Sequence, residues 1–403
     1  MRKPVLTIFY QFNPWQSTIG GIQTIINNFI KYAPDEFEVR LVGTSDKHNE
    51  QKKQWQEAEL AGRKVQFLPL FNLENDNVRS LVPTTLKYTA ALLGQSLASD
   101  FMHFHRLEHT LATLKWSGDK TLFIHNDIYQ QMQSKEDANA ILWRRFPQAY
   151  FLLESLLVKQ FERIVSCNSE SVKLYQQRYP AIADRVSFIK NTVDNQVFSQ
   201  LPLAERQAKK AALIQKLELP EDTEFVLFAG RLHPQKDPIL LVRAIAELTD
   251  LKNLHLLIAG EGELALQVRS EIERLGLSPR VTMLGPVIQA ELAQLHQIAS
   301  VFVLSSAYEG LPLVVLEALA CGTPVVTTDC GETPKLLNSD CGVVCPERTP
   351  DAIAQAVRQV TQHPEKYPTQ SCVRAAQPYI AGNVIAEVYS EMLYRWEKQI
   401  ASN

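Results

Sequence analysis

The chain has 403 residues, more than a single hydrophobic core normally supports, so its length predicts two domains. Hydrophobic residues make up 45% of it and charged residues 21%, which is typical of an ordinary soluble globular protein. Residues 1–200 carry 23 Lys and Arg against 20 Asp and Glu, a net charge of +3, whereas residues 201–403 carry 18 against 24, a net charge of −6. So small a positive excess does not indicate a nucleic-acid partner, although it permits a basic patch that faces an acceptor or a membrane.

Nothing in the sequence predicts secretion or a membrane span. The apolar run near the N-terminus is too short for a signal peptide, and no apolar stretch approaches the ~20 residues that a spanning helix needs. The six cysteines form no C-x-x-C pair and lack zinc-ligand spacing, so we interpret them as reduced thiols. We therefore expect a cytoplasmic protein, with peripheral contact at the inner face of the plasma membrane as an open alternative.

Apolar runs alternate with helical patterns along the chain, which predicts parallel sheets covered by helices on both faces. The expected fold class is α/β, with two Rossmann-like doubly wound domains. The domain boundary is expected near residues 195–220, where the chain is polar and charge-dense. The predicted strands are residues 5–12, 38–44, 64–70, 101–105, 121–125, 163–168 and 186–191 in the first half, and 225–230, 255–260, 280–285, 300–305, 324–329 and 342–345 in the second.

Two segments of the first half are expected to border a ligand site. Gly20 and Gly21 follow the first strand and open a helix, where glycine lets the backbone approach a phosphate closely; a plain turn is the alternative. Asn191 and Asp194 follow the last strand of this half and are expected at the same edge, with the alternative that Asp194 only caps the next turn.

Three histidines of the first half lie at or near strand ends. His105 and His125 each end a predicted strand. His125 could contact a ligand there, although a lone histidine at a strand end is more often structural. His103 is expected to point to the face opposite to His105 and to be buried in the core. A neutral imidazole at His105 could hydrogen-bond a ligand.

The loop after the first strand of the second half carries two cations. Arg231 and Lys236 precede a helix that is expected to begin near Asp237 and Pro238, with Asp as the N-cap and Pro at the first position. Arg offers a planar fork and Lys a movable point charge, a pairing suited to a diphosphate. Surface cations usually only solubilise a protein, but two of them at a strand-to-helix turn favour anion binding.

Glu309 and Glu317 flank a second predicted strand-to-helix turn. The apolar run at residues 300–306 predicts a buried parallel strand, which a glycine and a proline end before a helix follows. The backbone N–H groups from Leu311 to Val314 have no partners inside that helix and suit a phosphate. Two carboxylates on either side of an anion site suit a ligand with hydroxyls on both sides of a phosphate, such as a nucleotide sugar.

The second half contains four segments in the order and spacing of a known family: GRLHPQK, IAGEGEL, RVTMLGPV and YEGLPLVVLEALACGTPVVTTDCGE. They resemble the retaining glycosyltransferases of family 4, which have the GT-B architecture of two Rossmann-like domains facing a central cleft. The match runs from about residue 225 to residue 344. Weaker similarity extends through most of the first half, except around residues 45–95 and 115–160.

The resemblance implies a nucleotide-sugar donor, a glycan or lipid-linked acceptor and no further cofactor. It places an acceptor-binding domain at residues 1–200, joined by a C-terminal helix at about residues 381–403 that crosses back to it. Residues 201–380 would then bind a UDP- or GDP-sugar. The implied activity is transfer of a hexose or N-acetylhexosamine in cell-envelope or exopolysaccharide synthesis.

The resemblance also implies roles for individual residues. Glu317 would accept hydrogen bonds from the ribose hydroxyls, and Glu309 would hold hydroxyls of the transferred sugar. His105 aligns with the family's cleft histidine, so the catalytic candidates are His105, Glu309, Arg231 and Lys236. The donor-binding candidates are Gly20, Gly21, Arg231, Lys236, Gly285, Pro286, Val287, Glu309, Gly310, Leu311, Pro312, Leu313, Val314 and Glu317, with backbone groups of residues 285–287 lining the base.

No metal site is expected. The D-x-D motif that holds a divalent metal in other transferases occurs nowhere in the chain, so the two cations and the helix start would neutralise the departing diphosphate. The strand that ends in His105 offers no acid for a covalent intermediate. We therefore favour attack by the acceptor from the face of the leaving group.

One segment hints at a membrane-linked acceptor. Residues 139–163 place Trp143, Arg144, Arg145 and Phe146 ahead of a helical apolar stripe. Basic and aromatic residues together suit an anionic lipid surface or a lipid-linked acceptor. An amphipathic helix that covers the sheet is the alternative.

Other functions remain open. Gly260-x-Gly262-x-x-Ala265 satisfies the short dinucleotide fingerprint of an oxidoreductase, but the next predicted strand ends without the acid that would hold a ribose. The GT-B fold also serves epimerases, glycoside phosphorylases and catalytically silent nucleotide-binding subunits. A complete set of donor residues argues against a silent subunit.

Overall fold

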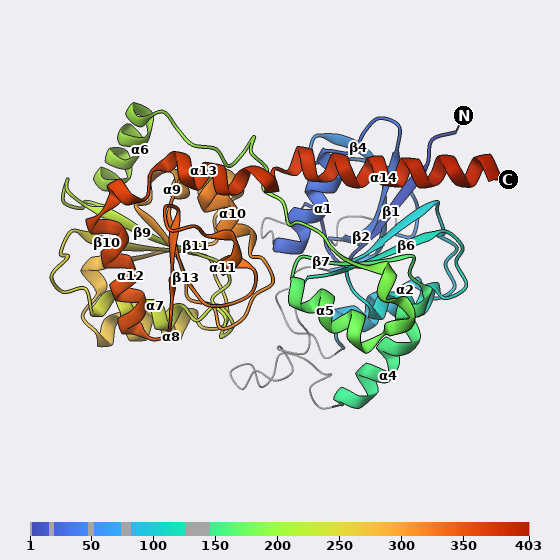
Figure 1. Cartoon of the computed structure of the whole chain (residues 1–403), viewed down its shortest axis with the longest axis horizontal. Coiled ribbons are helices and arrows are strands. Elements are labelled where there is room, and N and C mark those ends of the chain that lie inside the picture. The colour runs from blue at the N-terminus through green and yellow to red at the C-terminus, as the bar shows by residue number, and fades with distance from the viewer. Residues whose placement is uncertain (1, 16–19, 47–51, 74–81, 126–145, 403) are drawn as a thin grey trace. The chain divides into compact units, whose positions relative to one another are not determined.

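The computed structural model describes residues 2–15, 20–46, 52–73, 82–125 and 146–402 (Figure 1). Its contacts divide the chain into two units. Of the described residues, the first unit contains those up to 125, residues 146–190 and those from Ala381 onward, and the second contains Asn191–Ile380. The second unit thus begins before residue 200, because Asn191 already bonds within it.

The first unit is built on an eight-stranded sheet in the order β3-β4-β2-β1-β5-β6-β7-β8. β3 pairs antiparallel with β4, and the other neighbours are parallel. β3 is absent from the predicted strands because its sequence, QEAEL, contains no β-branched or aromatic residue. The strands are β1 (Val5–Phe9), β2 (Glu38–Ser45), β3 (Gln56–Leu60), β4 (Arg63–Asn72), β5 (Phe101–Phe104), β6 (Asp119–Ile124), β7 (Arg163–Ser166) and β8 (Val186–Phe188).

Helices cover both faces of this sheet, α1 and α14 on one face and α2, α4 and α5 on the other (Figure 1). Polar contacts fix the C-terminal helix α14 to the rest of the first unit, among them an ion pair between Arg163 of β7 and Glu391. Tyr389 Oη donates to Phe29 O at 2.9 Å, and Arg395 Nε lies 2.9 Å from Asp119 Oδ2. The helices are α1 (Gly21–Lys31), α2 (Thr84–Leu92), α4 (Pro147–Leu157), α5 (Ser169–Arg178) and α14 (Ala381–Ser402).

His103 and His105 point to the same face of β5. Both rings pack against Phe123, with centroid separations of 4.9 and 4.8 Å. The expectation of opposite faces is wrong, because residues two apart on a strand share a face. Burial lowers the pKa of His103 to about 3, so its imidazole is neutral. Together with residues of α14 it lines a cavity of about 250 Å³.

The second unit is built on a six-stranded parallel sheet in the order β11-β10-β9-β12-β13-β14. The chain runs outward from β9 to β11 and then returns to the other side of β9 with β12. The carboxyl ends of β9 and β12 therefore frame the point where the strand order reverses, which is where doubly wound sheets bind ligands. The strands are β9 (Glu224–Ala229), β10 (Leu254–Ala259), β11 (Val281–Gly285), β12 (Val301–Leu304), β13 (Val325–Thr328) and β14 (Gly342–Cys345).

Two helical layers sandwich this second sheet, α7, α8 and α12 on one face and α6, α9, α10 and α13 on the other (Figure 1). The three central strands β9, β10 and β12 are almost wholly apolar and buried on both faces, as is typical of parallel sheets. The predicted α/β fold of two Rossmann-like doubly wound domains is thereby confirmed. The helices are α6 (Leu203–Lys216), α7 (Pro238–Ala246), α8 (Ala265–Arg274), α9 (Gln289–Ile298), α10 (Leu313–Ala320), α11 (Thr333–Leu336), α12 (Pro350–Gln362) and α13 (Thr369–Ala376).

Candidate functional site

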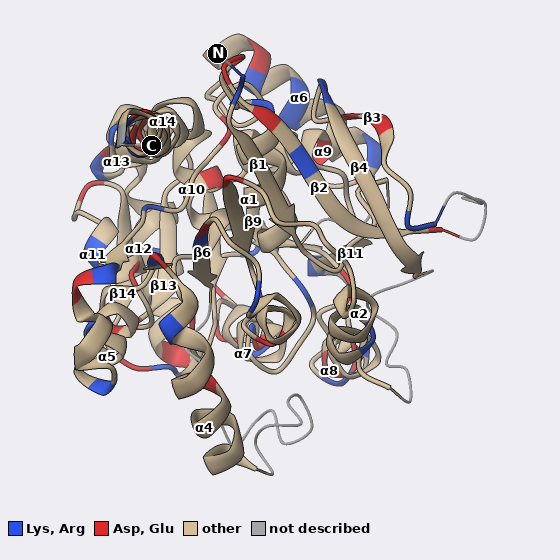
Figure 2. Cartoon of the chain, turned by 90° about the vertical axis from the view of Figure 1, so that its right-hand side faces the viewer, with Lys and Arg blue, Asp and Glu red and all other residues tan. Residues whose placement is uncertain are grey.

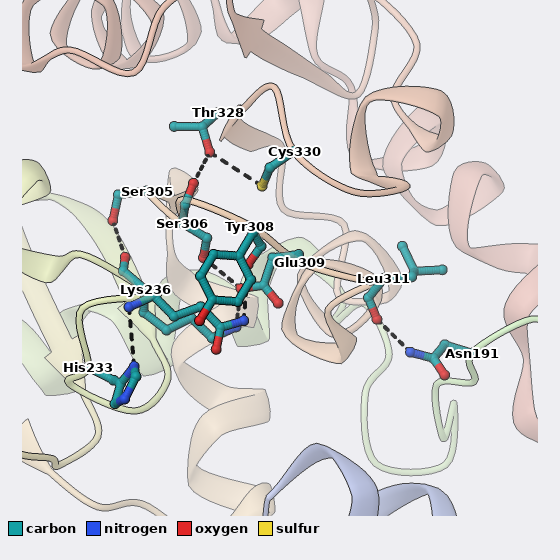
Figure 3. A network of polar contacts seen from close by, with 11 residues as sticks. Asn191, His233, Lys236, Ser305, Ser306, Tyr308, Glu309, Leu311, Thr328 and Cys330 are labelled. Carbon is teal, nitrogen blue, oxygen red and sulfur yellow. Dashed lines mark hydrogen bonds and ion pairs between the residues drawn. The ribbon is translucent and has the colours of Figure 1, made fainter. Parts of the chain in front are cut away.

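An ion pair joins the loops that follow β9 and β12. Lys236 Nζ lies 2.6 Å from Glu309 Oε1, and the two side chains are only 18% and 6% exposed (Figure 3). These residues come from either side of the point where the strand order reverses. The second unit thus holds one predicted cation and one predicted carboxylate in direct contact.

The backbone of the two loops is joined as well. Ala307 N donates to Gln235 O at 2.8 Å, and Gln235 Nε2 donates to Tyr308 O at 3.0 Å. Asp237 caps α7 as predicted, accepting from Leu240 N at 3.1 Å. The chain is therefore held on both sides of Lys236, at residues 235 and 237.

Two adjacent serines, which the sequence analysis did not single out, hold the pair in place. Ser305 Oγ donates to Lys236 O at 2.8 Å and to Asp237 O at 2.9 Å. Ser306 Oγ donates to Glu309 Oε1 at 2.7 Å (Figure 3). A sequence signal was present, because both hydroxyls interrupt the apolar run at the end of β12.

α10 begins beside the ion pair. Its N-cap is Pro312 and its first residue is Leu313, two positions after the predicted start of the N–H cradle at Leu311. Asn191 Nδ2 donates to Leu311 O at 2.5 Å and fixes the loop ahead of the helix. The N–H groups of Leu313 and Val314 open the helix, where they have no helical acceptors and where the helix dipole favours an anion.

Glu317 lies inside α10 and is 5% exposed. Its Oε2 is buried without a hydrogen-bond partner among the described residues. Burial raises the pKa of Glu317 to about 8, and the charge of Lys236 opposes that rise. A buried carboxyl oxygen without a partner is unfavourable, so a ligand hydroxyl at this atom would stabilise the site.

The remaining donor-binding candidates of the second unit lie in three loops. Arg231 is exposed, directly after the β9 turn. Gly310 accepts a hydrogen bond from Glu332 N at 2.9 Å through its carbonyl. Gly285 begins the segment 285–287 whose backbone is expected to line the base, and its carbonyl accepts from Gly260 N at 2.7 Å.

The glycines of the G-x-G-x-x-A segment have a packing role. A Cβ at Gly260 would lie 2.0 Å from Gly230 O, and one at Gly262 would lie 2.4 Å from Leu232 O. Both contacts are impossibly short, so these glycines let the loop after β10 pack on the loop that carries Arg231. The close approach of two loops explains the glycine spacing without a dinucleotide.

In the first unit, His105 and His125 follow the adjacent strands β5 and β6 and contact each other. His105 Nδ1 lies 2.8 Å from His125 Nε2, and the rings are stacked with centroids 5.1 Å apart. Burial, with the neighbouring histidines, lowers the pKa of His105 well below its usual value. Burial lowers the pKa of His125 to about 3. Both imidazoles are therefore neutral near pH 7.

Gly20 is the N-cap of α1 and Gly21 is its first residue, both exposed. Gln23 Oε1 accepts a hydrogen bond from Gly20 N. Asp194 caps a turn, since its Oδ1 accepts from Gln196 N at 3.0 Å. The glycine pair thus has the local structure of an ordinary helix start, and Asp194 has the capping role given above as its alternative.

The proposed lipid-facing segment is described only in part. Trp143, Arg144 and Arg145 lie outside the described residues. α4 exposes Phe146 at its N-cap, Leu152 and Leu156 by 60%, 65% and 59%. Figure 2 shows this helix mostly in the colour of uncharged residues, and its sequence, PQAYFLLESLL, contains one charged residue, Glu154.

Within the described ranges, no group of three or more His, Cys, Asp or Glu side chains is arranged to hold a metal ion. Of the helices in that part of the chain, none combines the length and hydropathy that crossing a bilayer requires.

Part of the second unit matches a known protein family. Residues 209–375 match the family described as glycosyl transferases group 1. D-inositol 3-phosphate glycosyltransferase of Streptomyces coelicolor is 28% identical over 279 residues, 64% of this chain and 61% of that protein. An uncharacterized glycosyltransferase of Methanocaldococcus jannaschii is 32% identical over 178 residues, 44% of this chain and 43% of that protein. The chain therefore spans about two fifths to three fifths of these relatives.

Solved structures resemble the whole chain. A sucrose-phosphate synthase from Thermosynechococcus elongatus has a TM-score of 0.79 at 18% identity, covering 100% of both chains. HepE of Anabaena, in complex with UDP and glucose, has a TM-score of 0.72 at 17% identity, covering 96% of this chain and 99% of its own. The lipopolysaccharide glycosyltransferase WaaG has a TM-score of 0.69 at 17% identity, covering 96% and 99%. Residues 209–375 are thus similar to the group 1 glycosyltransferases, and the two units each have the Rossmann-like fold of the GT-B class.

Proposed function

We propose that the protein is a retaining, metal-independent glycosyltransferase. It moves a hexose or N-acetylhexosamine from a UDP- or GDP-sugar to a glycan or lipid-linked acceptor in cell-envelope or exopolysaccharide synthesis. The observation that carries this proposal is the Lys236–Glu309 pair, held where the strand order of the second sheet reverses and beside the start of α10. A cation, a helix start and a buried carboxylate at one place suit a ligand with both phosphates and hydroxyls.

The diphosphate of the donor would lie against Lys236, Arg231 and the first N–H groups of α10. As the bond between the anomeric carbon and the diphosphate breaks, negative charge grows on the departing phosphate oxygen. Fixed cations and N–H groups stabilise that charge in the transition state more than in the bound donor. This arrangement supplies the neutralisation that a divalent metal provides in other transferases.

The nucleoside would be held by Glu317 and by the segment after β11. The ribose hydroxyls would donate to the buried Glu317 oxygen that lacks a partner among the described residues. Pro286 and Val287 would contact the base through their backbone. The UDP and glucose bound by HepE support a nucleotide-sugar ligand for this fold, although the likeness to that protein concerns the fold.

Glu309 would hold hydroxyls of the sugar and would not act as the nucleophile. The acceptor oxygen forms its bond to the anomeric carbon on the face that the diphosphate leaves, and its proton passes to the departing phosphate oxygen. Mass spectrometry of the protein incubated with donor alone tests this point. A glycosyl adduct on Glu309 would overturn same-face attack in favour of two displacements.

His105 would donate or accept a hydrogen bond as a neutral group from the first unit. Its Nε2 is buried without a hydrogen-bond partner among the described residues, whereas its Nδ1 is occupied by His125. A neutral imidazole can bind a sugar hydroxyl without adding positive charge near the forming cationic carbon.

A membrane-linked acceptor is the finer part of the proposal. Phe146, Leu152 and Leu156 expose large apolar side chains on and beside α4, and in the sequence the basic pair Arg144–Arg145 directly precedes them. Flotation with anionic and neutral liposomes at low salt tests it. Binding to anionic vesicles that Leu152→Glu abolishes supports a peripheral membrane protein, and absence of binding removes this part of the proposal.

Thermal unfolding with a panel of nucleotides and nucleotide sugars tests the function most directly. A ligand at 100 times its Kd adds about 2.7 kcal/mol to the free energy of unfolding, which shifts the midpoint measurably. Product analysis with the stabilising sugar nucleotide separates transfer from the epimerase and phosphorylase alternatives. Titration with NADH tests the oxidoreductase, which predicts a shift with the dinucleotide instead.

A further inference from the structure

One oxygen of Glu309 receives two hydrogen bonds of different kinds. Lys236 Nζ lies 2.6 Å from Glu309 Oε1, and Ser306 Oγ donates to the same oxygen at 2.7 Å (Figure 3). The lysine is the partner that a diphosphate would attract. A sugar nucleotide that binds Lys236 therefore weakens one of the contacts that orient Glu309.

Ser306 is the fixed partner of the two. It is completely buried, and its carbonyl accepts a hydrogen bond from Thr328 Oγ1 of β13 at 2.6 Å. Its short side chain has a single torsion to its hydroxyl, whereas the lysine ammonium ends a flexible four-carbon stem and is 18% exposed. The serine hydroxyl can thus stay on Glu309 while the ammonium moves.

We propose that Ser306 is a positioning residue that keeps Glu309 oriented toward the sugar after Lys236 engages the diphosphate of the donor. The inference rests on the proposed function. In the ligand-free protein Lys236 and Glu309 neutralise each other, and in the donor complex each takes its own part of the ligand. Ser306 prevents the buried carboxylate from turning away or taking up a proton when its cation is drawn off.

Ser305 provides a matched control. It is also completely buried and differs from Ser306 by one position, but its hydroxyl donates to Lys236 O and Asp237 O. Ser305 therefore supports the cation loop, and Ser306 supports the carboxylate. Removing the Ser306 hydroxyl should therefore weaken binding of the sugar, and removing the Ser305 hydroxyl should weaken binding of the nucleoside diphosphate.

The experiment measures calorimetric affinities of Ser306→Ala and Ser305→Ala for UDP, GDP and the sugar nucleotide that stabilises the wild type most, together with turnover. The affinity of Ser306→Ala for the nucleoside diphosphate should stay within about twofold of the wild-type value. The variant should lose the extra affinity that the sugar adds, and its turnover should fall by about tenfold or more. Ser305→Ala should weaken the nucleoside diphosphate itself. Ser306→Thr, which keeps a hydroxyl, should restore sugar affinity and turnover.

Three results decide the matter. If Ser306→Ala keeps full sugar affinity and turnover, or loses nucleoside diphosphate affinity as strongly as Ser305→Ala, the positioning role is wrong. If Ser306→Ala fails to fold, Ser306→Cys retains the volume with a weaker donor, and the same loss of sugar affinity is expected. If the wild type binds no nucleotide at all, the proposed function itself fails, and the inference fails with it.

Discussion

Each of the two sheets has a pair of polar side chains at its strand ends, and one pair is charged whereas the other is neutral. In the second unit, Lys236 and Glu309 from the loops after β9 and β12 form an ion pair of 2.6 Å. In the first unit, His105 and His125 from the ends of β5 and β6 form a contact of 2.8 Å between imidazoles that burial keeps neutral. Both pairs follow neighbouring parallel strands, so the same topology presents charge in one unit and neutral hydrogen-bonding groups in the other.

This difference fits a division of chemical tasks. Charged groups that neutralise each other can exchange partners with a ligand that carries both phosphates and hydroxyls. Neutral imidazoles can bind hydroxyls without attracting an anion or repelling a cation. The ion pair is therefore the better candidate for donor binding, and the imidazole pair for contacts with uncharged parts of a substrate.

Removing the cation of the charged pair should have the largest effect. Lys236→Ala should lower turnover by roughly 10²–10³-fold, because a preorganised charge on the leaving group is lost. Lys210→Ala is the matched control, since Lys210 forms an ion pair of the same length, 2.6 Å, with Glu224 at the opposite end of β9. Steady-state kinetics with the stabilising sugar nucleotide measure both variants.

The comparison fails if the two lysine variants behave alike. Near-wild-type turnover of Lys236→Ala would leave the diphosphate without its proposed partner. A strong loss of wild-type turnover on chelation of divalent metals would also contradict the role of Lys236, because a metal ion would then supply the positive charge.

Much of this arrangement could be predicted from the sequence. The positions of β9 and β12 were predicted from apolar runs that are followed by polar loops. Lys236 was predicted from the charge of a diphosphate, and Glu309 from the hydroxyls of the sugar. Their mutual contact could not be predicted, because they are 73 residues apart and meet only since β12 returns to lie beside β9. Strand order depends on the packing of the whole unit.

The supporting groups were harder to foresee. Ser306 resembles any polar residue at a strand end until the direction of its hydroxyl is known. His105 and His125 were separate candidates, and their contact depends on the parallel register of β5 and β6. The wrong face assigned to His103 has a simpler origin, since the period of two on a strand places it beside His105.

Replacing Glu317, in the second unit, should change how the stability of the protein depends on pH. The folded-state pKa of about 8 exceeds the ordinary 4.5, so the folded state holds the extra proton and wild type loses stability as pH rises from 4.5 to 8. Glu317→Gln removes this loss, and its stability relative to wild type should improve by up to about 4 kcal/mol between pH 5 and pH 8. Urea unfolding at the two pH values measures the change.

Glu271→Gln is the control for this pH dependence. Hydrogen bonds from Arg274 and Arg243 lower the pKa of Glu271 to about 2, so this carboxylate stays ionised from pH 5 to pH 8. Its replacement should leave the slope of stability against pH as in wild type. Equal slopes for Glu317→Gln and wild type would contradict a protonated Glu317.

Gly331 packs closely against the backbone of Glu309 and Gly310, and replacing it tests that contact. This residue has φ +63°, and a Cβ there would lie 2.2 Å from Gly310 O and 2.6 Å from Glu309 O. Gly276 has nearly the same φ, +66°, with open space around a Cβ. Gly276→Ala should cost about 1 kcal/mol through backbone strain alone, and Gly331→Ala should cost roughly 2–3 kcal/mol and weaken nucleotide binding. Equal costs would show that the loop can move away from Glu309.

The smallest expected effect concerns acid sensitivity of the neutral pair. His125 has a folded-state pKa of about 3 against an ordinary 6.5, so the unfolded chain takes up the proton and stability falls as pH drops below 6.5. His125→Gln cannot take up that proton, and between pH 7.5 and pH 5.5 it should lose about 1 kcal/mol less stability than wild type. Because the readout is a difference between two pH values, any pH-independent cost of losing the contact with His105 cancels.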